Sequence, residues 1–226
     1  MSHSLWSPPA LAVQGGSTFP ARHVWCVGRN YAEHAREMGA DPAAAEPIFF
    51  SKPAAALIQS EQVAFPADTS ELHHEVELVV ALGQGGRDLD AQTALACAAF
   101  YAVGVDLTRR DVQTKAKAAG HPWEMSKAFD QSAPLGLLVP ARQWSPSPDA
   151  RISLQVGDDE RQRARMSDMI WGVGELLALL SARITLQPGD LVFTGTPAGV
   201  GPLRAGDRVV AEVDGLPRLE FQLATD

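Results

Sequence analysis

The sequence predicts an α+β protein that consists mostly of β-strands, with a few helices at its flanks. Short runs with strand composition are separated by turn signals along most of the chain, whereas only four segments have helical composition. No repeat or low-complexity tract is present. The 226 residues suffice for one substantial core. We therefore expect one compact domain built on a twisted, mostly antiparallel sheet system.

Composition narrows the class of partner. The formal net charge is -8, and no block of lysine and arginine alternates with aromatic residues, which disfavours nucleic acid. No apolar run is long enough to cross a bilayer, and the N-terminus lacks a secretory signal. Cys26 and Cys97 have no motif spacing and are typical of free thiols. We expect a cytoplasmic protein without a membrane or nucleic-acid partner, acting on a small molecule.

The first third begins with residues 1–20, which are rich in Ser, Pro and Gly and are expected to form an N-terminal arm. The body of the protein, residues 21–226, follows. Residues 22–27 have strand composition, and the segment Gly28-Arg29-Asn30 interrupts them. Residues 31–38 then form a short helical run that ends at Gly39. The break between strand and helix is a place where chemistry could occur.

The middle of the chain predicts two buried strands and two helices. Residues 73–82 are the most strand-like stretch and end at a glycine-rich turn, after which 90–99 form an alanine-rich helix. Residues 100–107 predict another buried strand, and 109–119 a helix closed by Gly120. The candidate metal ligands fall on these two strands.

The last third returns to short strands. We expect strands at 151–156 and at 191–194, and a closing pair around Asp214-Gly215, each delimited by turn residues. Residues 172–182 interrupt them as one helix.

Three acids form the first candidate site. Alternate residues of a strand point to one face, so Glu75 and Glu77 project together while Val76 and Leu78 face the other way. Asp106 lies in an otherwise apolar strand, where an unpaired charge is costly. A hard divalent cation such as Mg²⁺ or Mn²⁺ would relieve the repulsion, because it prefers oxygen ligands.

Two other interpretations of these acids stay open on spacing alone. The glutamates could lie on a solvated strand face while Asp106 pairs with Arg109 or Arg110. Alternatively, a histidine could complete a zinc site. Because neighbouring strand residues point to opposite faces, only His73 of the pair His73-His74 could join the glutamates.

A second candidate is the pair His34 and Glu37. They stand at i and i+3 of a helical run and are therefore neighbours on one face. A carboxylate beside an imidazole fixes its tautomer and favours it as a general base near neutral pH. The alternative is a pair of surface residues without a catalytic role.

Six motifs, in this order, resemble the fumarylacetoacetate hydrolase family, and they run from about Arg22 to the C-terminus. Among its members the chain is most similar to acylpyruvate and fumarylpyruvate hydrolases. The motifs are Gly28-Arg29-Asn30-Tyr31 with His34 and Glu37, Phe49-Phe50-Ser51-Lys52-Pro53, His74-Glu75-Val76-Glu77-Leu78, Asp106-Leu107-Thr108-Arg109-Arg110-Asp111-Val112-Gln113, Ser126-Lys127-Ala128-Phe129-Asp130 and Thr194-Gly195-Thr196-Pro197-Ala198-Gly199-Val200-Gly201.

The resemblance implies a mixed β-roll or sandwich with flanking helices for residues 21–226, usually as a homodimer. It implies that Glu75, Glu77 and Asp106 bind Mg²⁺ or Mn²⁺. It also implies catalytic and substrate-binding roles for other residues. These are His34 and Glu37 as a water-activating dyad on a lid, Lys127 reaching the substrate, and Arg29, Gln113 and Thr196 holding its carboxylate and oxo groups.

Two cations have ambiguous roles. Arg109 replaces a small residue of many relatives and could bind a dicarboxylic substrate, or could be a solvated residue at a helix start. Lys52 could border the site or only anchor a turn.

The resulting hypothesis is metal-dependent hydrolysis of the C–C bond of a small 2,4-dioxo acid, such as fumarylpyruvate, to fumarate and pyruvate. The alternatives are an oxaloacetate decarboxylase, which needs no attacking water, and an isomerase of an unsaturated dioxo acid.

Overall fold

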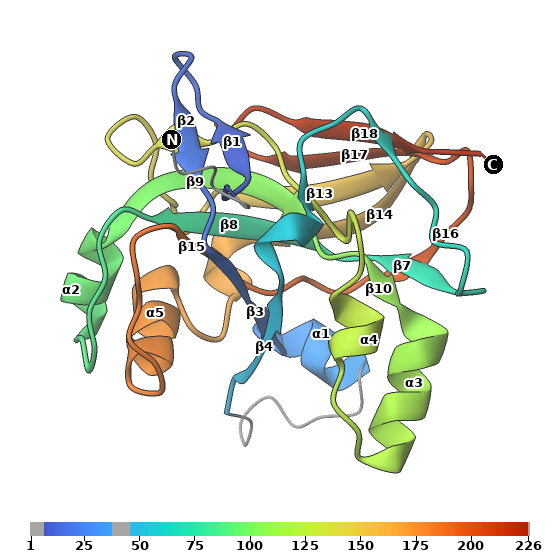
Figure 1. The fold of residues 1–226 in the computed structure, drawn as a ribbon, viewed down its shortest axis with the longest axis horizontal. Coiled ribbons are helices and arrows are strands. Elements are labelled where there is room, and N and C mark those ends of the chain that lie inside the picture. Colours follow the sequence, from blue (N-terminus) through green and yellow to red (C-terminus); the bar gives the residue numbers. More distant parts are fainter. Residues whose placement is uncertain (1–6, 38–45, 226) are drawn as a thin grey trace, which may run out of the picture.

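In the computed structural model, which describes residues 7–37 and 46–225, two larger β-sheets pack face to face (Figure 1). Val80 and Val103 from one sheet share a hydrophobic core with Ile152 and Phe221 from the other. Helices lie at the edges of this pair of sheets. The predicted class, α+β with mostly strands, is confirmed.

The larger sheet is mixed and has six strands, with β15 parallel to β3 and the other neighbours antiparallel. Its strands, in spatial order, are β12 (Val139–Pro140), β9 (Ala98–Val105), β8 (Val76–Leu82), β15 (Asp190–Phe193), β3 (His23–Gly28) and β4 (Ile48–Lys52). Every residue of β8 is buried. Leu78 faces the core shared with the second sheet, and Val79 faces a smaller core on the opposite side.

The second sheet has five strands and is antiparallel except for β6, which pairs parallel to β18. Its strands, in spatial order, are β14 (Asp159–Arg165), β13 (Arg151–Val156), β17 (Arg208–Val213), β18 (Leu219–Leu223) and β6 (Gln62–Val63). The closing pair predicted around Asp214-Gly215 is the β17–β18 hairpin.

Three small sheets complete the strand system. They are the hairpin of β1 (Ala10–Ala12) and β2 (Thr18–Pro20), the parallel pair β5 (Leu57–Ile58) and β11 (Ala133–Pro134), and the set β10 (Thr108–Arg109), β7 (Leu72–His74) and β16 (Gly201–Leu203). The hairpin lies within the segment expected to be an arm. Its Leu11 and Phe19, with Val13, are buried in the smaller core, so it covers that face of the six-stranded sheet.

The helices are short. They are α1 (Ala32–Glu37), α2 (Ala91–Ala96), α3 (Arg110–Ala119), α4 (Glu124–Lys127) and α5 (Val173–Ser181), with 3₁₀ turns η1 (Ala54–Ala56) and η2 (Met166–Asp168). Asp90 caps α2, accepting hydrogen bonds from the amides of Gln92 and Thr93. A left-handed Gly120 ends α3, at the predicted stop. Gly174 lets α5 approach α2, because a Cβ there would lie 2.6 Å from the Ala91 carbonyl oxygen.

Two predicted boundaries were wrong. The strand expected at 73–82 is broken at Glu75, where the chain leaves β7 for β8 and changes sheet. The helix expected at 90–99 ends at Ala96, because Ala98 already pairs with Leu82 in the six-stranded sheet. The predicted helix at 31–38 is α1 up to Glu37, and residue 38 lies outside the described residues.

Two composition-based expectations were also tested. Cys26 and Cys97 are both free and buried. Across residues 7–37 and 46–225, no helix has the length and apolar character needed to cross a bilayer.

Candidate active site

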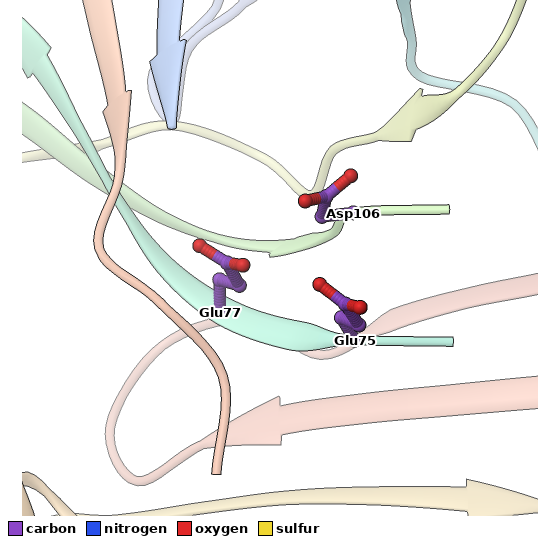
Figure 2. A group of neighbouring side chains, drawn as sticks. All are labelled: Glu75, Glu77 and Asp106. Carbon is purple, nitrogen blue, oxygen red and sulfur yellow. The ribbon is translucent and has the colours of Figure 1, made fainter. Parts of the chain in front are cut away.

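Three buried carboxylates gather where β8 and β9 run side by side. Glu77 on β8 lies opposite Gly104 of β9, and the amide of Asp106, just beyond β9, donates to the Glu75 carbonyl at 2.8 Å. This register brings oxygen atoms of all three carboxylates within 4.8 Å of one another, and none of the three residues is more than 5% exposed. Figure 2 shows Glu77 on β8 and Glu75 just before it on the same side as Asp106, which follows the end of β9. The predicted cluster of acids is therefore present.

Buried lysines neutralise part of this charge. Lys127 Nζ lies 2.8 Å from Glu75 Oε2 and 2.6 Å from Asp106 Oδ2, and Lys52 Nζ lies 2.8 Å from Asp106 Oδ1. Arg110 forms a further ion pair with Glu75. Burial opposes ionisation of Glu75, but Lys127 and Arg110 outweigh it and hold its pKa well below the usual range. The solvated-face interpretation of the acids is wrong, and Asp106 pairs with lysines rather than with Arg109 or Arg110.

Glu77 is in the opposite electrostatic situation. Burial, together with the carboxylates of Asp106 and Glu75, raises its pKa well above the usual range. Among the described residues it pairs with no cationic side chain, and its Oε2 accepts only the amide hydrogen of Gly195, at 2.6 Å. Asp106 Oδ1 accepts no hydrogen bond from the same residues, although Lys52 lies near it. These oxygens fit a divalent cation, which would stabilise the three acids in ionised form.

Glu75 connects the acid cluster to a pocket in which most of the predicted substrate-binding residues meet. Val27, Gly28, Arg29, His34, Gln113, Lys127 and Thr196 line it, together with Phe50, Glu75, Arg110, Lys117 and Trp123. Four of these side chains are lysine or arginine, whereas Glu75 is the one carboxylate among them. The pocket therefore suits a small anion held next to the acid cluster.

His34 and Glu37 are paired at the edge of this pocket. His34 Nδ1 lies 3.4 Å from Glu37 Oε2, and the His34 residue is 7% exposed. If Nδ1 carries the proton toward Glu37, Nε2 is left as a free base. Burial lowers the pKa of His34, although Glu75 and Glu37 oppose that shift. The imidazole is thus neutral at physiological pH and able to accept a proton.

The loop before α1 is held by a residue that the sequence did not single out. Asn30 Nδ2 donates to the Thr194 carbonyl at 2.8 Å, and Asn30 Oδ1 accepts from the Trp171 amide at 2.9 Å. These two hydrogen bonds hold the backbone next to Arg29, whose φ of 66° is unusual for a residue other than glycine. Asn30 therefore positions Arg29 at the pocket.

Thr196 depends on a buried glutamine. Gln162 Nε2 donates to Thr196 Oγ1 at 2.8 Å, while Gln162 Oε1 lies 2.9 Å from His74 Nδ1. His74 thus faces away from the acids. His73, the residue considered for a zinc site, lies 3.4 Å from Arg110 Nε and does not belong to the cluster of possible metal ligands. The described residues thus offer oxygen ligands alone at this place.

The prediction for Arg109 needs correction. Thr108 and Arg109 are successive residues of β10 and point to opposite faces, so Thr108 contacts Lys127 and Arg109 turns away from the pocket. Arg109 pairs with Asp68 at 2.8 Å and stacks over Phe129. Of the two neighbouring arginines, Arg110 lines the pocket, and it donates to Gln113 Oε1 at 2.5 Å.

Further pocket residues were missed from the sequence. On α3, Arg110, Gln113 and Lys117 stand at i, i+3 and i+7, the spacing of one helix face, and this signal could have identified Arg110 and Lys117. Phe50 lies in one of the six motifs but had been given no role, and Trp123 had no local signal. Lys52 has a clear place, since it is buried against Asp106.

A cluster of three buried acids beside a cation-lined pocket fits an enzyme site for a divalent ion and a small anion. Residues 23–224 match the family described as "Fumarylacetoacetate (FAA) hydrolase C-terminal". The chain therefore belongs to the fumarylacetoacetate hydrolase family.

The similar proteins carry two different enzyme names. A solved structure titled fumarylpyruvate hydrolase from Pseudomonas aeruginosa, in complex with Mn²⁺ and pyruvate, is 45% identical, with a TM-score of 0.96 and all of both chains covered. An oxaloacetate tautomerase of Escherichia coli is 44% identical over 199 residues, which cover 87% of this chain and 90% of the relative. A mitochondrial oxaloacetate tautomerase of Mus musculus is 39% identical, covering 92% of this chain and 97% of the relative.

Proposed function

We propose that the protein hydrolyses the C–C bond of a 2,4-dioxo acid, with fumarylpyruvate cleaved to fumarate and pyruvate. The observation that carries this proposal is a buried His34, paired with Glu37, in the cationic pocket that Glu75 of the acid cluster also lines. The similarity to a solved fumarylpyruvate hydrolase over the whole chain supports the choice of substrate.

Glu75, Glu77 and Asp106 would hold Mg²⁺ or Mn²⁺ through carboxylate oxygens. When bound, the ion would polarise the 2-oxo group and offset the negative charge of the departing enolate. Arg29, Gln113 and Thr196, which line the pocket beside the acids, would orient the carboxylate and oxo groups of the pyruvate half.

His34 would act as the general base. Its free nitrogen accepts a proton from water, whose oxygen adds to the C4 carbonyl carbon, and Lys127 at the pocket wall steadies the resulting oxyanion. The C3–C4 bond then breaks, and its electron pair leaves with the pyruvate enolate. Protonation of that enolate at C3 gives pyruvate, and the added oxygen remains in the new carboxylate of fumarate.

A parallel assay tests the proposal. Purified protein with Mg²⁺ or Mn²⁺ is given fumarylpyruvate, acetylpyruvate or oxaloacetate, and pyruvate and carbon dioxide are measured together. We expect pyruvate to form fastest from fumarylpyruvate. Exhaustive chelation of the metal ion should stop this formation. Carbon dioxide released from oxaloacetate as the leading activity would instead identify a decarboxylase.

A second candidate is tautomerisation of oxaloacetate, favoured by the curated relatives of that name at 44% and 39% identity. It is similar in kind to the isomerase alternative, because the His34–Glu37 pair would move a proton without activating water. Enol–keto conversion of oxaloacetate that exceeds fumarylpyruvate cleavage in kcat/KM would favour this candidate.

We also propose a homodimer, which rests on the family resemblance. Light scattering of the protein after gel filtration would give twice the mass of one chain. A monomer would contradict this part of the proposal without affecting the proposed chemistry.

A further inference from the structure

One face of α3 lines the pocket from its inner to its outer end. Arg110 begins this face beside Glu75, Gln113 follows one turn later, and Lys117 follows two turns later. At 1.5 Å per residue, Lys117 stands about 10 Å further along the helix than Arg110. The helix therefore places one cation at the acid cluster and another at a distance from it.

The charges at the two ends are satisfied differently. Arg110 and Lys127 both pair with Glu75, so their charge is compensated within the protein. Lys117 pairs with no carboxylate of the described residues, and its Nζ lies 5.1 Å from the centre of the Trp123 ring. Desolvation and the Arg110 guanidinium lower the pKa of Lys117 to about 8. A cation placed among cations at a pocket favours an anionic ligand.

We propose that Lys117, lying over Trp123, binds the distal carboxylate of the substrate and makes the pocket selective for dicarboxylic 2-oxo acids of about seven carbons. This rests on the proposed function, which places the pyruvate half of the substrate at the acid cluster. Lys117 would be a specificity-determining residue.

The spacing of Arg110 and Lys117 along α3 favours a long diacid over a short one. An extended chain advances about 1.2 Å per bond, so a seven-carbon diacid spans ~7 Å between its carboxyl carbons and a four-carbon diacid ~4 Å. The flexible lysine side chain can cover the remaining distance from α3. Phe50 and Trp123, whose ring centres are 5.9 Å apart, give the apolar middle of the chain a wall to lie against.

Binding of two uncleavable ligands tests the proposal without depending on turnover. 2-Oxoheptanedioate and 2-oxoheptanoate differ only in a terminal carboxylate, and neither has the 4-oxo group that cleavage requires. Calorimetry with Mn²⁺-loaded protein should show the diacid bound about tenfold more tightly, as expected for one charge-assisted hydrogen bond. Lys117→Met should abolish this preference, and Lys117→Arg should keep it.

The matched control is Lys115→Met, which removes an exposed lysine of the same helix that does not line the pocket, and it should keep the full preference. A wild-type protein that binds both ligands equally, or a Lys117→Met protein that still prefers the diacid, would overturn the proposal.

Steady-state kinetics provide the second readout. In Lys117→Met, the ratio of kcat/KM for fumarylpyruvate to that for acetylpyruvate should fall about tenfold, mainly through KM. An equal loss on both substrates would indicate a merely structural role and contradict selectivity. If the wild-type protein cleaves neither substrate, the proposed hydrolysis fails, while the ligand-binding result still decides the role of Lys117.

Discussion

The acid cluster and the His34–Glu37 pair are built in opposite ways. Glu77 lies on β8, which is hydrogen-bonded to β9 on one side and β15 on the other, and its side chain is buried. Glu37 lies on the six-residue helix α1, its side chain is 43% exposed, and it accepts the Gly199 amide hydrogen at 3.2 Å. The sheet interior thus positions the acids, whereas a short helix with a few hydrogen bonds near the surface positions the base.

This difference implies that ion binding and proton transfer can be separated experimentally. Substitutions in the sheet should remove the ion and all activity that depends on it. Substitutions on α1 should leave ion binding intact and slow the reaction.

The largest effect is expected for Glu77→Gln. Loss of one of three carboxylates should weaken Mn²⁺ binding by more than about 100-fold and reduce turnover to background. The metal-free protein should become more stable, because it no longer holds a buried acid whose ionisation is opposed by burial and by the carboxylates of Asp106 and Glu75. Calorimetric titration with Mn²⁺ and thermal unfolding in EDTA measure the two effects. Glu212→Gln, an exposed strand residue, is the matched control and should change neither.

His34→Ala should be the next most severe change. Removal of a general base typically costs ~10² to 10⁴ in rate, whereas binding of Mn²⁺ and of oxalate, a pyruvate analogue, should stay within about twofold of wild type. Single-turnover kinetics and calorimetry separate the two quantities. His121→Ala removes an exposed histidine outside the pocket and should have no effect. An unchanged rate of hydrolysis in His34→Ala would contradict the role of His34 as the general base.

Glu37→Gln should have a smaller effect, about 10- to 100-fold on kcat. The amide can still contact His34 Nδ1 and the Gly199 amide, but it no longer stabilises the imidazolium that forms when His34 takes a proton. Steady-state kinetics with fumarylpyruvate give the value. The control is Glu33→Gln, which changes an exposed residue of the same helix and should keep the wild-type kcat. If Glu33→Gln lowers kcat as much as Glu37→Gln does, the loss reflects general damage to α1.

The smallest expected effect is the change of kcat/KM with pH. Burial disfavours the charged imidazole, so the pKa of His34 is lowered and the neutral base persists below the usual histidine range. The value of kcat/KM should therefore stay constant as the pH falls to about 6.5 and should decline only below that pH. A pH profile of fumarylpyruvate cleavage measures this, and a decline that begins above pH 7 would contradict a buried, neutral base.

Features set by local chemistry were predicted well from the sequence. The strand at 151–156 and the stop of α3 at Gly120 follow from alternation and from a residue that accepts a left-handed conformation. The proximity of Glu75 and Glu77 follows from the strand repeat, although the chain changes sheet at Glu75.

Features set by long-range pairing were not predictable in this way. Whether Arg109 or Arg110 faces the pocket depends on the pairing of β10 with β7, where Thr108 lies opposite His73. The sequence therefore left the role of Arg109 ambiguous. The Lys52–Asp106 contact joins segments 54 positions apart and requires the folded sheet. Lys117 differs from these two cases, because it lies on the helix face of Gln113 and the helical spacing could have identified it.

The most direct test of the central claim is fumarylpyruvate cleavage in ¹⁸O-labelled water with Mn²⁺-loaded protein, followed by mass spectrometry of both products. Attack of a water molecule on the C4 carbonyl carbon predicts one ¹⁸O atom in fumarate and, after correction for spontaneous exchange, none in pyruvate. Unlabelled fumarate, or no cleavage while the protein interconverts the enol and keto forms of oxaloacetate, would contradict it.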